Sequence, residues 1–334
     1  MHVPHVEHSG AADLHVAIDA GGTKTELVLF AGDGTVRDRW RGKGCNPSRI
    51  GLEQAGNELG ALLEALLRDH GGMSLPLASL FAGIAGGTVV DRERYLEKRF
   101  RAALPHAKQV ATGSDMVNAL NSGLGRRQDG MALIAGTGSV AYVRIAGTGH
   151  RIGGWGPVLD DEGSGFHLGR LALKAVLMQG DGRGPATLLT ALCEERLGKP
   201  APEAVPDIER LGPVYVASFA PMVFQAAQQQ DQVAGEILEQ CADRLALLVR
   251  AGLDRFPAAV TPRLTVVGGV LSGADNPLLA LLTARLDRPC EIILPDLPPV
   301  FGAAVEAVEL AGHAPDERFR DTFRATLKLH PPKE

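Results

Sequence analysis

Apolar residues along the chain form short continuous runs that alternate with longer stretches in which they recur every three or four positions. Short runs predict buried strands, and the wider spacing predicts amphipathic helices. The Asp-Gly pair at 33 and 34 lies between two short runs and predicts a hairpin turn. We expect strands at 14–19, 26–30, 35–40, 80–84 and 108–111, and helices at 50–69, at 91–104 and from Ser114-Asp115 onward. This order predicts an α/β domain that opens with a three-stranded meander.

The same pattern restarts near residue 130. A strand at 130–135, a Gly-Thr-Gly-Ser turn and a strand at 140–145 repeat the opening of the first domain, which predicts a duplicated domain. A glycine-containing connection and a long helical region at 163–256 follow, and within that region the segment PAPEAVP (200–206) predicts a surface loop. The last elements expected are strands at 263–267 and 291–294 and a helix that starts near Pro298.

The chain length of 334 residues favours two domains, because single cores rarely grow beyond about 250 to 300 residues. We predict a flexible N-terminal extension at 1–13 and an N-terminal domain at 14–122. A C-terminal domain with a helical insertion is expected at 123–312, and the remaining segment, 313–334, is expected to pack back on the N-terminal domain.

Composition argues against several classes of function. A net charge of −5 and an aromatic content of 4% disfavour nucleic acid, which needs a basic surface and stacking side chains. No run of about 18 apolar residues is present, so we expect no membrane partner. Residues 1–13 lack a signal-peptide pattern, so we expect a cytoplasmic protein. The four cysteines are far apart in sequence, which predicts buried thiols and no zinc or iron-sulfur site.

Two glycine-rich turns carry the candidate chemistry. The first, DAGGTKT (19–25), places the carboxylate of Asp19 at the end of a strand, beside glycines that allow close approach of a phosphate and threonines that donate to it. A plain Gly-Gly hairpin turn is the structural alternative. The second turn, GTGS (136–139), leaves backbone N–H groups for an anion. A further glycine cluster at 153–156 leads into the acidic residues 160–162, so phosphate, metal and a polar ligand can meet there.

Six segments occur in the order in which one protein family carries them. They are DAGGTKTELVLF (19–30), CNPSRIG (45–51), GSDMVNAL (113–120), LIAGTGS (133–139), GGWGPVLDDEGSGFHLG (153–169) and VVGGVLSG (266–273). On these segments the chain resembles the N-acetylglucosamine kinase and benzoyl-CoA reductase activator family, within the ATPase superfamily of sugar kinases, heat-shock chaperones and actin. The resemblance implies an α/β fold with two ribonuclease H-like domains of the actin/hexokinase type, whose mixed five-stranded sheets flank a nucleotide cleft.

The resemblance also implies roles for individual residues. Those that would bind ATP are Gly21, Gly22, Thr23, Lys24 and Thr25 in a first phosphate loop, Gly136, Thr137, Gly138 and Ser139 in a second, and Gly268, Gly269 and Ser272 in an adenosine loop. Asp19 would face Mg²⁺. Asp115 matches the catalytic base and also contacts the substrate, although a helix N-terminal charge or cap is its structural alternative. The other positions that match sugar contacts are Asn46, Gly154, Trp155 and Asp161.

Two of these positions leave an alternative open. Trp155 is either a sugar contact or a hinge or core aromatic. Relatives usually carry glycine where this chain has Asp160, and the extra carboxylate either favours a cationic amino sugar or points to solvent.

The implied function is an ATP-dependent amino-sugar kinase that acts on N-acetylglucosamine at the 6-hydroxyl, as a homodimer. A kinase of glucosamine or of an N-acetylmuramate-type sugar is the alternative acceptor. An ATPase that activates a radical dehydratase or reductase is the alternative of another class, but no cysteine lies near the segment after Asp115, where the ligands of its iron-sulfur cluster are expected. A sugar-responsive repressor would need a DNA-binding module, for which the residues before Leu14 are too few.

Overall fold

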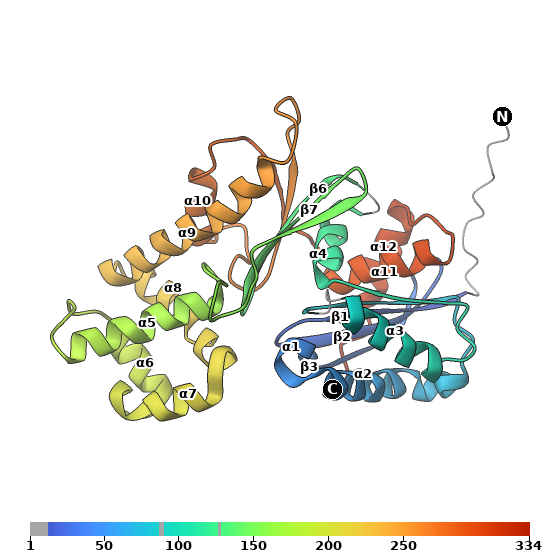
Figure 1. The fold of residues 1–334 in the computed structure, drawn as a ribbon, viewed down its shortest axis with the longest axis horizontal. Coiled ribbons are helices and arrows are strands. Elements are labelled where there is room, and N and C mark those ends of the chain that lie inside the picture. Colours follow the sequence, from blue (N-terminus) through green and yellow to red (C-terminus); the bar gives the residue numbers. More distant parts are fainter. Residues whose placement is uncertain (1–12, 87–89, 126–127) are drawn as a thin grey trace. The chain divides into compact units, whose positions relative to one another are not determined.

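The computed structural model describes residues 13–86, 90–125 and 128–334, so most of the predicted N-terminal extension lies outside the described residues. The chain forms two compact units. The first contains residues up to 128 together with 295–334, and the second contains residues 129–294 (Figure 1). None of the described helices is both long and apolar enough to cross a lipid bilayer.

The first unit is built on a mixed five-stranded sheet with the order β3-β2-β1-β4-β5. Its strands are β1 (Leu14–Ala20), β2 (Lys24–Ala31), β3 (Val36–Lys43), β4 (Ser79–Ile84) and β5 (Gln109–Gly113). The first three strands form the predicted antiparallel meander, and β4 and β5 run parallel to β1. Residues along β1 alternate between the two faces of the sheet, so both faces need a covering layer.

Helices cover both faces of the first sheet (Figure 1). They are α1 (Pro47–Ile50), α2 (Leu52–Leu67), α3 (Val90–Ala103), α4 (Asp115–Leu124), α11 (Pro299–Leu310) and α12 (Glu317–Leu327), with 3-10 turns at Arg68–His70 and Gly72–Ser74. Leucines of α2 pack with Val16 and Ile18 on one face. On the other face, Phe301, Phe319 and Phe323 pack against Phe30.

The sheet of the second unit has the same strand order and the same strand directions as the sheet of the first unit. Its strands are β6 (Gly130–Ala135), β7 (Ser139–Ile145), β8 (Thr148–Ile152), β9 (Arg263–Val267) and β10 (Glu291–Ile293), in the order β10-β9-β6-β7-β8. β6, β7 and β8 are antiparallel neighbours, and β9 and β10 run parallel to β6. The predicted α/β fold with two mixed five-stranded sheets is therefore confirmed.

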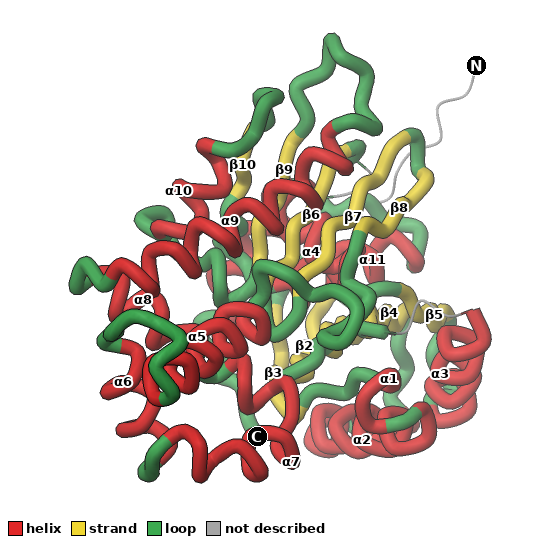
Figure 2. Tube along the Cα trace, turned by 60° about the vertical axis from the view of Figure 1, so that its left-hand side comes forward, coloured by secondary structure: helices red, strands yellow, loops and turns green. Residues whose placement is uncertain are grey.

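Six helices accompany the second sheet. They are α5 (Gly165–Gly180), α6 (Leu189–Leu197), α7 (Ala201–Ala217), α8 (Ala220–Gln228), α9 (Gln232–Leu253) and α10 (Pro277–Ala284). Figure 2 shows α9 running across the strands of this sheet. Ile237, Cys241 and Leu245 recur every four residues along α9 and belong to the core of this unit.

Two local predictions in the second unit are wrong. Residues 201–206 do not form a loop but begin α7, which is kinked at Gly212. Pro202 lies in the first turn, where a backbone N–H has no helical partner, and the burial of Ala201 and Ala204 favours the helix. The glycine connection after β7 contains β8, an edge strand paired only to β7.

Residues 295–312, predicted to end the second domain, belong instead to the first unit. α11 packs closely on α4, because Gly302 has no side chain: a Cβ there would lie 1.9 Å from the Asn118 carbonyl oxygen. The segment after α11 also stays with this unit. Lys333 pairs with the edge strand β3 through backbone bonds to Arg39 and Arg41 of 3.0 and 2.7 Å.

Candidate functional site

Asp19 lies near the carboxyl end of β1, at the start of the first glycine turn. Asn118 of α4 donates from Nδ2 to Asp19 Oδ1 over 2.8 Å. The pKa of Asp19 is raised to about 7, first by burial and then by the carboxylates of Asp115 and Glu26, against the lowering effect of the Asn118 hydrogen bond. Carboxylates are therefore concentrated at this end of β1, and such an environment favours the binding of a cation.

Asp115 is the first residue of α4. The cap of this helix is the neighbouring residue Ser114, whose Oγ accepts from Met116 N over 3.1 Å. Ser114 Oγ also lies 3.3 Å from Asp115 Oδ1. Ser114 supplies the cap, so Asp115 is not the cap of α4. The alternative that Asp115 is a helix N-terminal charge stays open, because it is the acidic residue of the first turn, where the partial positive charge of the helix favours a carboxylate.

The first glycine turn is closed by its own backbone, with Gly21 N donating to Lys24 O over 2.9 Å. Thr23 and Lys24 are exposed on this turn, and Gly21 and Gly22 are partly exposed. Thr25 is different: its side chain is fully buried. Thr23 is therefore the exposed threonine of this turn, whereas Thr25 is buried beneath the surface.

Asn46 caps α1, and its Oδ1 accepts from Ser48 N over 2.8 Å. Its Nδ2 therefore remains to donate to a ligand. Gly86 has a φ of 68° and makes room for this side chain, because a Cβ there would lie 2.4 Å from Asn46 Oδ1. Arg49, on the same short helix, donates to Gly22 O over 2.8 Å. This bond links the α1 segment to the first glycine turn.

The second glycine turn, Gly136 to Ser139, lies against the N-terminus of α5. Gly165 N donates to Gly136 O over 2.8 Å, and Phe166 N donates to Thr137 O over 3.1 Å. The helix is capped by Ser164 and runs for 16 residues. Its dipole adds positive potential beside the turn, so this place favours an anion such as a phosphate.

Trp155 follows Gly154 and is 65% exposed, so it is not a core aromatic. The guanidinium of Arg151 lies over its ring, 4.5 Å from the centroid. Arg151 also donates to the carbonyl oxygens of Gly153 and Gly154. One arginine therefore fixes both the backbone of this turn and the face of the indole ring.

The two acidic residues after this turn have different roles. Asp160 does not simply point to solvent: it is partly buried, and its Oδ2 accepts from Trp155 N over 3.3 Å. Asp161 has a φ of 59°, and its Oδ1 accepts from Ser139 N over 3.3 Å. Burial raises the pKa of Asp161, and Asp160 adds to this effect, whereas the Ser139 bond lowers it. Asp161 thus connects the predicted sugar-contacting turn to the second phosphate turn.

The loop after β9 packs on the end of β6. Gly268 has a φ of 108°, and a Cβ there would lie 2.2 Å from the Ala135 carbonyl oxygen. That oxygen accepts from Val270 N over 3.1 Å. Ser272 Oγ donates back to Gly269 O over 3.0 Å and closes the loop. This loop and the second glycine turn therefore both lie at the carboxyl end of β6.

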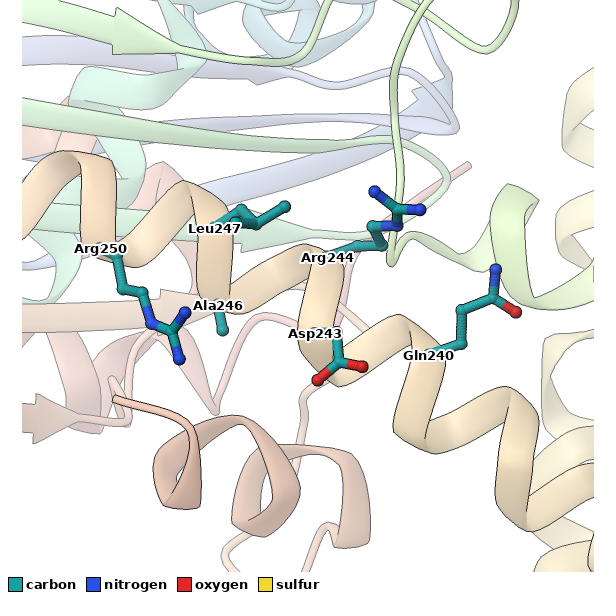
Figure 3. Close-up of a pocket in the computed structure, with 6 residues that line it drawn as sticks. All are labelled: Gln240, Asp243, Arg244, Ala246, Leu247 and Arg250. Atoms are coloured by element: carbon teal, nitrogen blue, oxygen red, sulfur yellow. The ribbon is translucent and has the colours of Figure 1, made fainter. Parts of the chain in front are cut away.

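The predicted site residues fall into one group in each unit. The first unit brings together Asp19, the turn at 21–25, Asn46 and Asp115, and the second unit brings together the turns at 136–139, 154–161 and 268–272. A pocket of about 270 Å³ on the exposed side of α9 is a separate feature (Figure 3). It is lined by Gln240, Asp243, Arg244, Ala246, Leu247 and Arg250 and includes none of the predicted residues.

Three residues of these groups were missed by the sequence analysis: Asn118, Arg49 and Arg151. Asn118 and Arg49 lie inside two of the six segments on which the chain resembles the family. Asn118 follows Asp115 by three residues, which is about one helical turn. That spacing was a usable signal for Asn118. Arg151 lies just before the segment at 153–169. No signal in the sequence pointed to it, because its role depends on strand β8, which was not predicted.

Comparison with known proteins agrees with this arrangement. The chain is 27% identical over 319 residues to the N-acetyl-D-glucosamine kinase of Dictyostelium discoideum, covering 89% of this chain and 98% of the relative. It is 31% identical over 269 residues to the N-acetylmuramic acid/N-acetylglucosamine kinase of Clostridium acetobutylicum, covering 78% and 86%. The solved structure of a candidate N-acetylglucosamine kinase from Chromobacterium violaceum matches with a TM-score of 0.68 and 25% identity, covering 90% of this chain and all of that one.

The model of one protein family matches residues 16–307 of this chain. The predicted resemblance is thereby confirmed, and the use of ATP follows from the family's description as ATPases. The chain belongs to the BadF/BadG/BcrA/BcrD ATPase family.

Proposed function

We propose that the protein is an ATP-dependent amino-sugar kinase that transfers the γ-phosphate to the 6-hydroxyl of N-acetylglucosamine. The observation that carries this proposal is the pair of carboxylates Asp19 and Asp115, at the end of β1 and the start of α4, in which the pKa of Asp19 is raised first by burial and then by Asp115. Phosphoryl transfer to an alcohol needs one carboxylate that faces a metal ion and one that accepts a proton. Both relatives named above are kinases that act on N-acetylglucosamine, according to their names.

Asp115 is assigned the role of base. Its carboxylate accepts the proton of the sugar hydroxyl while that oxygen bonds to the γ-phosphorus and the bond from phosphorus to the β,γ-bridging oxygen breaks, which releases ADP. The start of α4 holds Asp115 in its anionic form. In the second unit, the turn at 136–139 and the dipole of α5 are assigned to the phosphates, although Gly136 N and Ser139 N donate within the protein. Residues 268–272 are assigned to the adenosine.

The residues at the end of β1 fit Mg²⁺. Among the described residues no group of three or more His, Cys, Asp or Glu side chains is placed to hold a metal, which excludes a cage built from such side chains there. Mg²⁺ in kinases keeps several waters and takes one or two carboxylates together with phosphate oxygens. Asn118 occupies Asp19 Oδ1, which leaves Oδ2 for a hydrated ion. When bound, the ion would neutralise charge on the phosphates.

The acceptor is assigned to Asn46, Gly154, Trp155 and Asp161. The exposed indole face suits the apolar face of a pyranose, and the amide and carboxylate suit its hydroxyls. The two relatives named above carry N-acetylglucosamine in their names, which favours that acceptor over glucosamine.

A coupled assay of ADP release tests the proposal. ATP turnover should be slow alone and rise strongly with N-acetylglucosamine, and a panel with glucosamine and N-acetylmuramic acid ranks the acceptors by kcat/KM. Replacement of Asp115 with Asn should lower kcat by about 10² to 10⁴-fold and leave nucleotide binding intact. Sugar-independent hydrolysis together with a brown chromophore bound under anaerobic conditions would support an activator ATPase and overturn the kinase assignment.

We also propose a homodimer, by the resemblance to the family. Light scattering coupled to gel filtration measures the mass directly, and a mass near the 35.2 kDa of one chain would refute it.

A further inference from the structure

Asn118 is fully buried in the first unit, one helical turn after Asp115. Its Nδ2 donates to Asp19 Oδ1 over 2.8 Å and lies 3.3 Å from the backbone oxygen of Ile18. Both partners are acceptors, so they fix which end of the amide faces β1. The amide therefore presents its donor to the carboxylate that is assigned to the metal.

The surroundings of Asn118 are shaped to hold this amide. Gly83 is the neighbour of Asp19 on β4, and a Cβ at Gly83 would lie 2.3 Å from Asn118 Nδ2. On the other side, Gly302 of α11 lies against the Asn118 backbone. Gly83 thus leaves the space that the amide fills, and Gly302 lets α11 pack closely on the backbone of Asn118.

Asn118 also keeps a polar atom without a partner. Within the described residues, its Oδ1 is buried and has no hydrogen-bond partner. A buried acceptor left unpaired is unfavourable, and an apolar side chain of similar size would avoid that cost. We therefore expect the hydrogen bond that Asn118 Nδ2 donates to Asp19 to offset this cost.

We propose that Asn118 is a positioning residue for the metal ion. By holding Asp19 Oδ1, it turns Oδ2 toward the ion and links the metal-facing strand to the helix that carries Asp115. A lysine in its place would compete with the cation, and a carboxylate would add to the repulsion among Asp19, Asp115 and Glu26. A neutral donor satisfies Asp19 without changing the net charge. This inference rests on the proposed function, because that function assigns Asp19 to Mg²⁺.

The chain offers a matched control one turn further along α4. Asn121 is equally buried, donates from Nδ2 to Glu306 Oε1 over 2.5 Å, and also has an Oδ1 without a partner within the described residues. Among the described residues, the side-chain hydrogen bond of Asn121 goes to Glu306 of α11 and to no residue assigned to the site. Its replacement measures the effect of losing a buried amide on α4 itself.

The experiment compares Asn118→Leu and Asn118→Ala with Asn121→Leu and Asn121→Ala in the full chain. Electron paramagnetic resonance measures Mn²⁺ binding in the presence of ADP, and calorimetry measures ADP binding in EDTA. Both Asn118 variants should weaken Mn²⁺ about 10 to 100-fold, as loss of a partner to a metal-ligating carboxylate commonly does, with ADP binding in EDTA unchanged. The Asn121 variants should remain within twofold of wild type. Leucine preserves volume and alanine favours the helix, so one of the two remains usable if the other fails to fold.

Equal losses in the Asn118 and Asn121 variants, or unchanged Mn²⁺ affinity in the Asn118 variants, would overturn the inference. A wild-type protein that binds ADP equally with and without metal would overturn it as well. A wild-type protein that phosphorylates no amino sugar, but shows the contrast between the two asparagines, would refute only the proposed acceptor.

Discussion

His15 should make the first unit sensitive to acid. Its ring is fully buried on β1 and stacks on Phe30, with ring centroids 5.3 Å apart. Ser79 Oγ donates to Ala307 O over 2.5 Å, so His15 Nδ1 must carry the proton in its 2.8 Å bond to Ser79 Oγ. This leaves Nε2 as a buried acceptor with no partner among the described residues. A second proton would be buried there without an acceptor, and burial lowers the pKa of His15 to about 4.

The size and sign of the effect follow from the two pKa values. Above pH 6.5 the ring is neutral in both the folded and the unfolded chain, so the stability is fully present. As the pH falls below 6.5 the unfolded chain takes up a proton that the folded chain refuses until about pH 4, so stability is lost. Between pH 7.5 and pH 5.0 this amounts to about 2 kcal/mol.

Urea unfolding of wild type and His15→Phe at the two pH values isolates this effect. Phenylalanine keeps the stacked ring and cannot titrate, so the stability difference between the two proteins should shift by about 2 kcal/mol in favour of the variant at pH 5.0. Comparison with the variant matters because the pKa of Asp19, raised to about 7, acts in the opposite direction over this range. In a Trp155→Phe background, the fluorescence of Trp40 reports the first unit alone. A difference that stays constant with pH would refute the reasoning.

Two further predictions concern the second unit. Replacement of Arg151 with Ala removes the cation from the Trp155 ring and should raise the KM of the sugar about two- to fivefold, with the KM of ATP unchanged; an unchanged sugar KM in steady-state kinetics would contradict this role. Replacement of Gly268 with Ala should destabilise the unit by about 1 to 3 kcal/mol or more, because its φ of 108° and its approach to the Ala135 oxygen exclude a side chain. Gly269→Ala is the control, since a Cβ there has no atom within 4 Å, and equal melting temperatures for the two variants would disprove the argument.

Local chemistry predicted the strands and turns that carry the candidate site. Asp19, Gly136 and Gly268 each lie where an apolar run ends, and the structure places each of them at or just beyond the end of a strand. Such positions can be predicted from sequence because a strand and the turn that ends it are both set by neighbouring residues. The start of α4 belongs to the same class, since Ser114 is a common capping residue.

Features that depend on distant contacts were not predictable in this way. The proline-rich segment at 201–206 has the composition of a loop, and its helix is favoured by the burial of Ala201 and Ala204. The membership of α11 in the first unit depends on the fit of Gly302 against α4, almost two hundred residues earlier in the chain. For Asn118, the spacing from Asp115 indicated its place on α4, but its hydrogen bond to Asp19, 99 residues away, was not predictable.

The raised pKa of Asp19 also bears on the reason for an aspartate at this position. Burial and two nearby carboxylates disfavour the charged form of Asp19, so near and above its pKa of about 7 the ionised group opposes folding. An asparagine at position 19 would keep an acceptor for Asn118 and remove this cost. Selection for stability alone would therefore favour asparagine, and natural sites that sacrifice stability are commonly those that bind or react. The cation proposed at Asp19 would reverse the balance, because it would stabilise the charged form, so the same carboxylate that weakens the ligand-free protein would strengthen the metal complex.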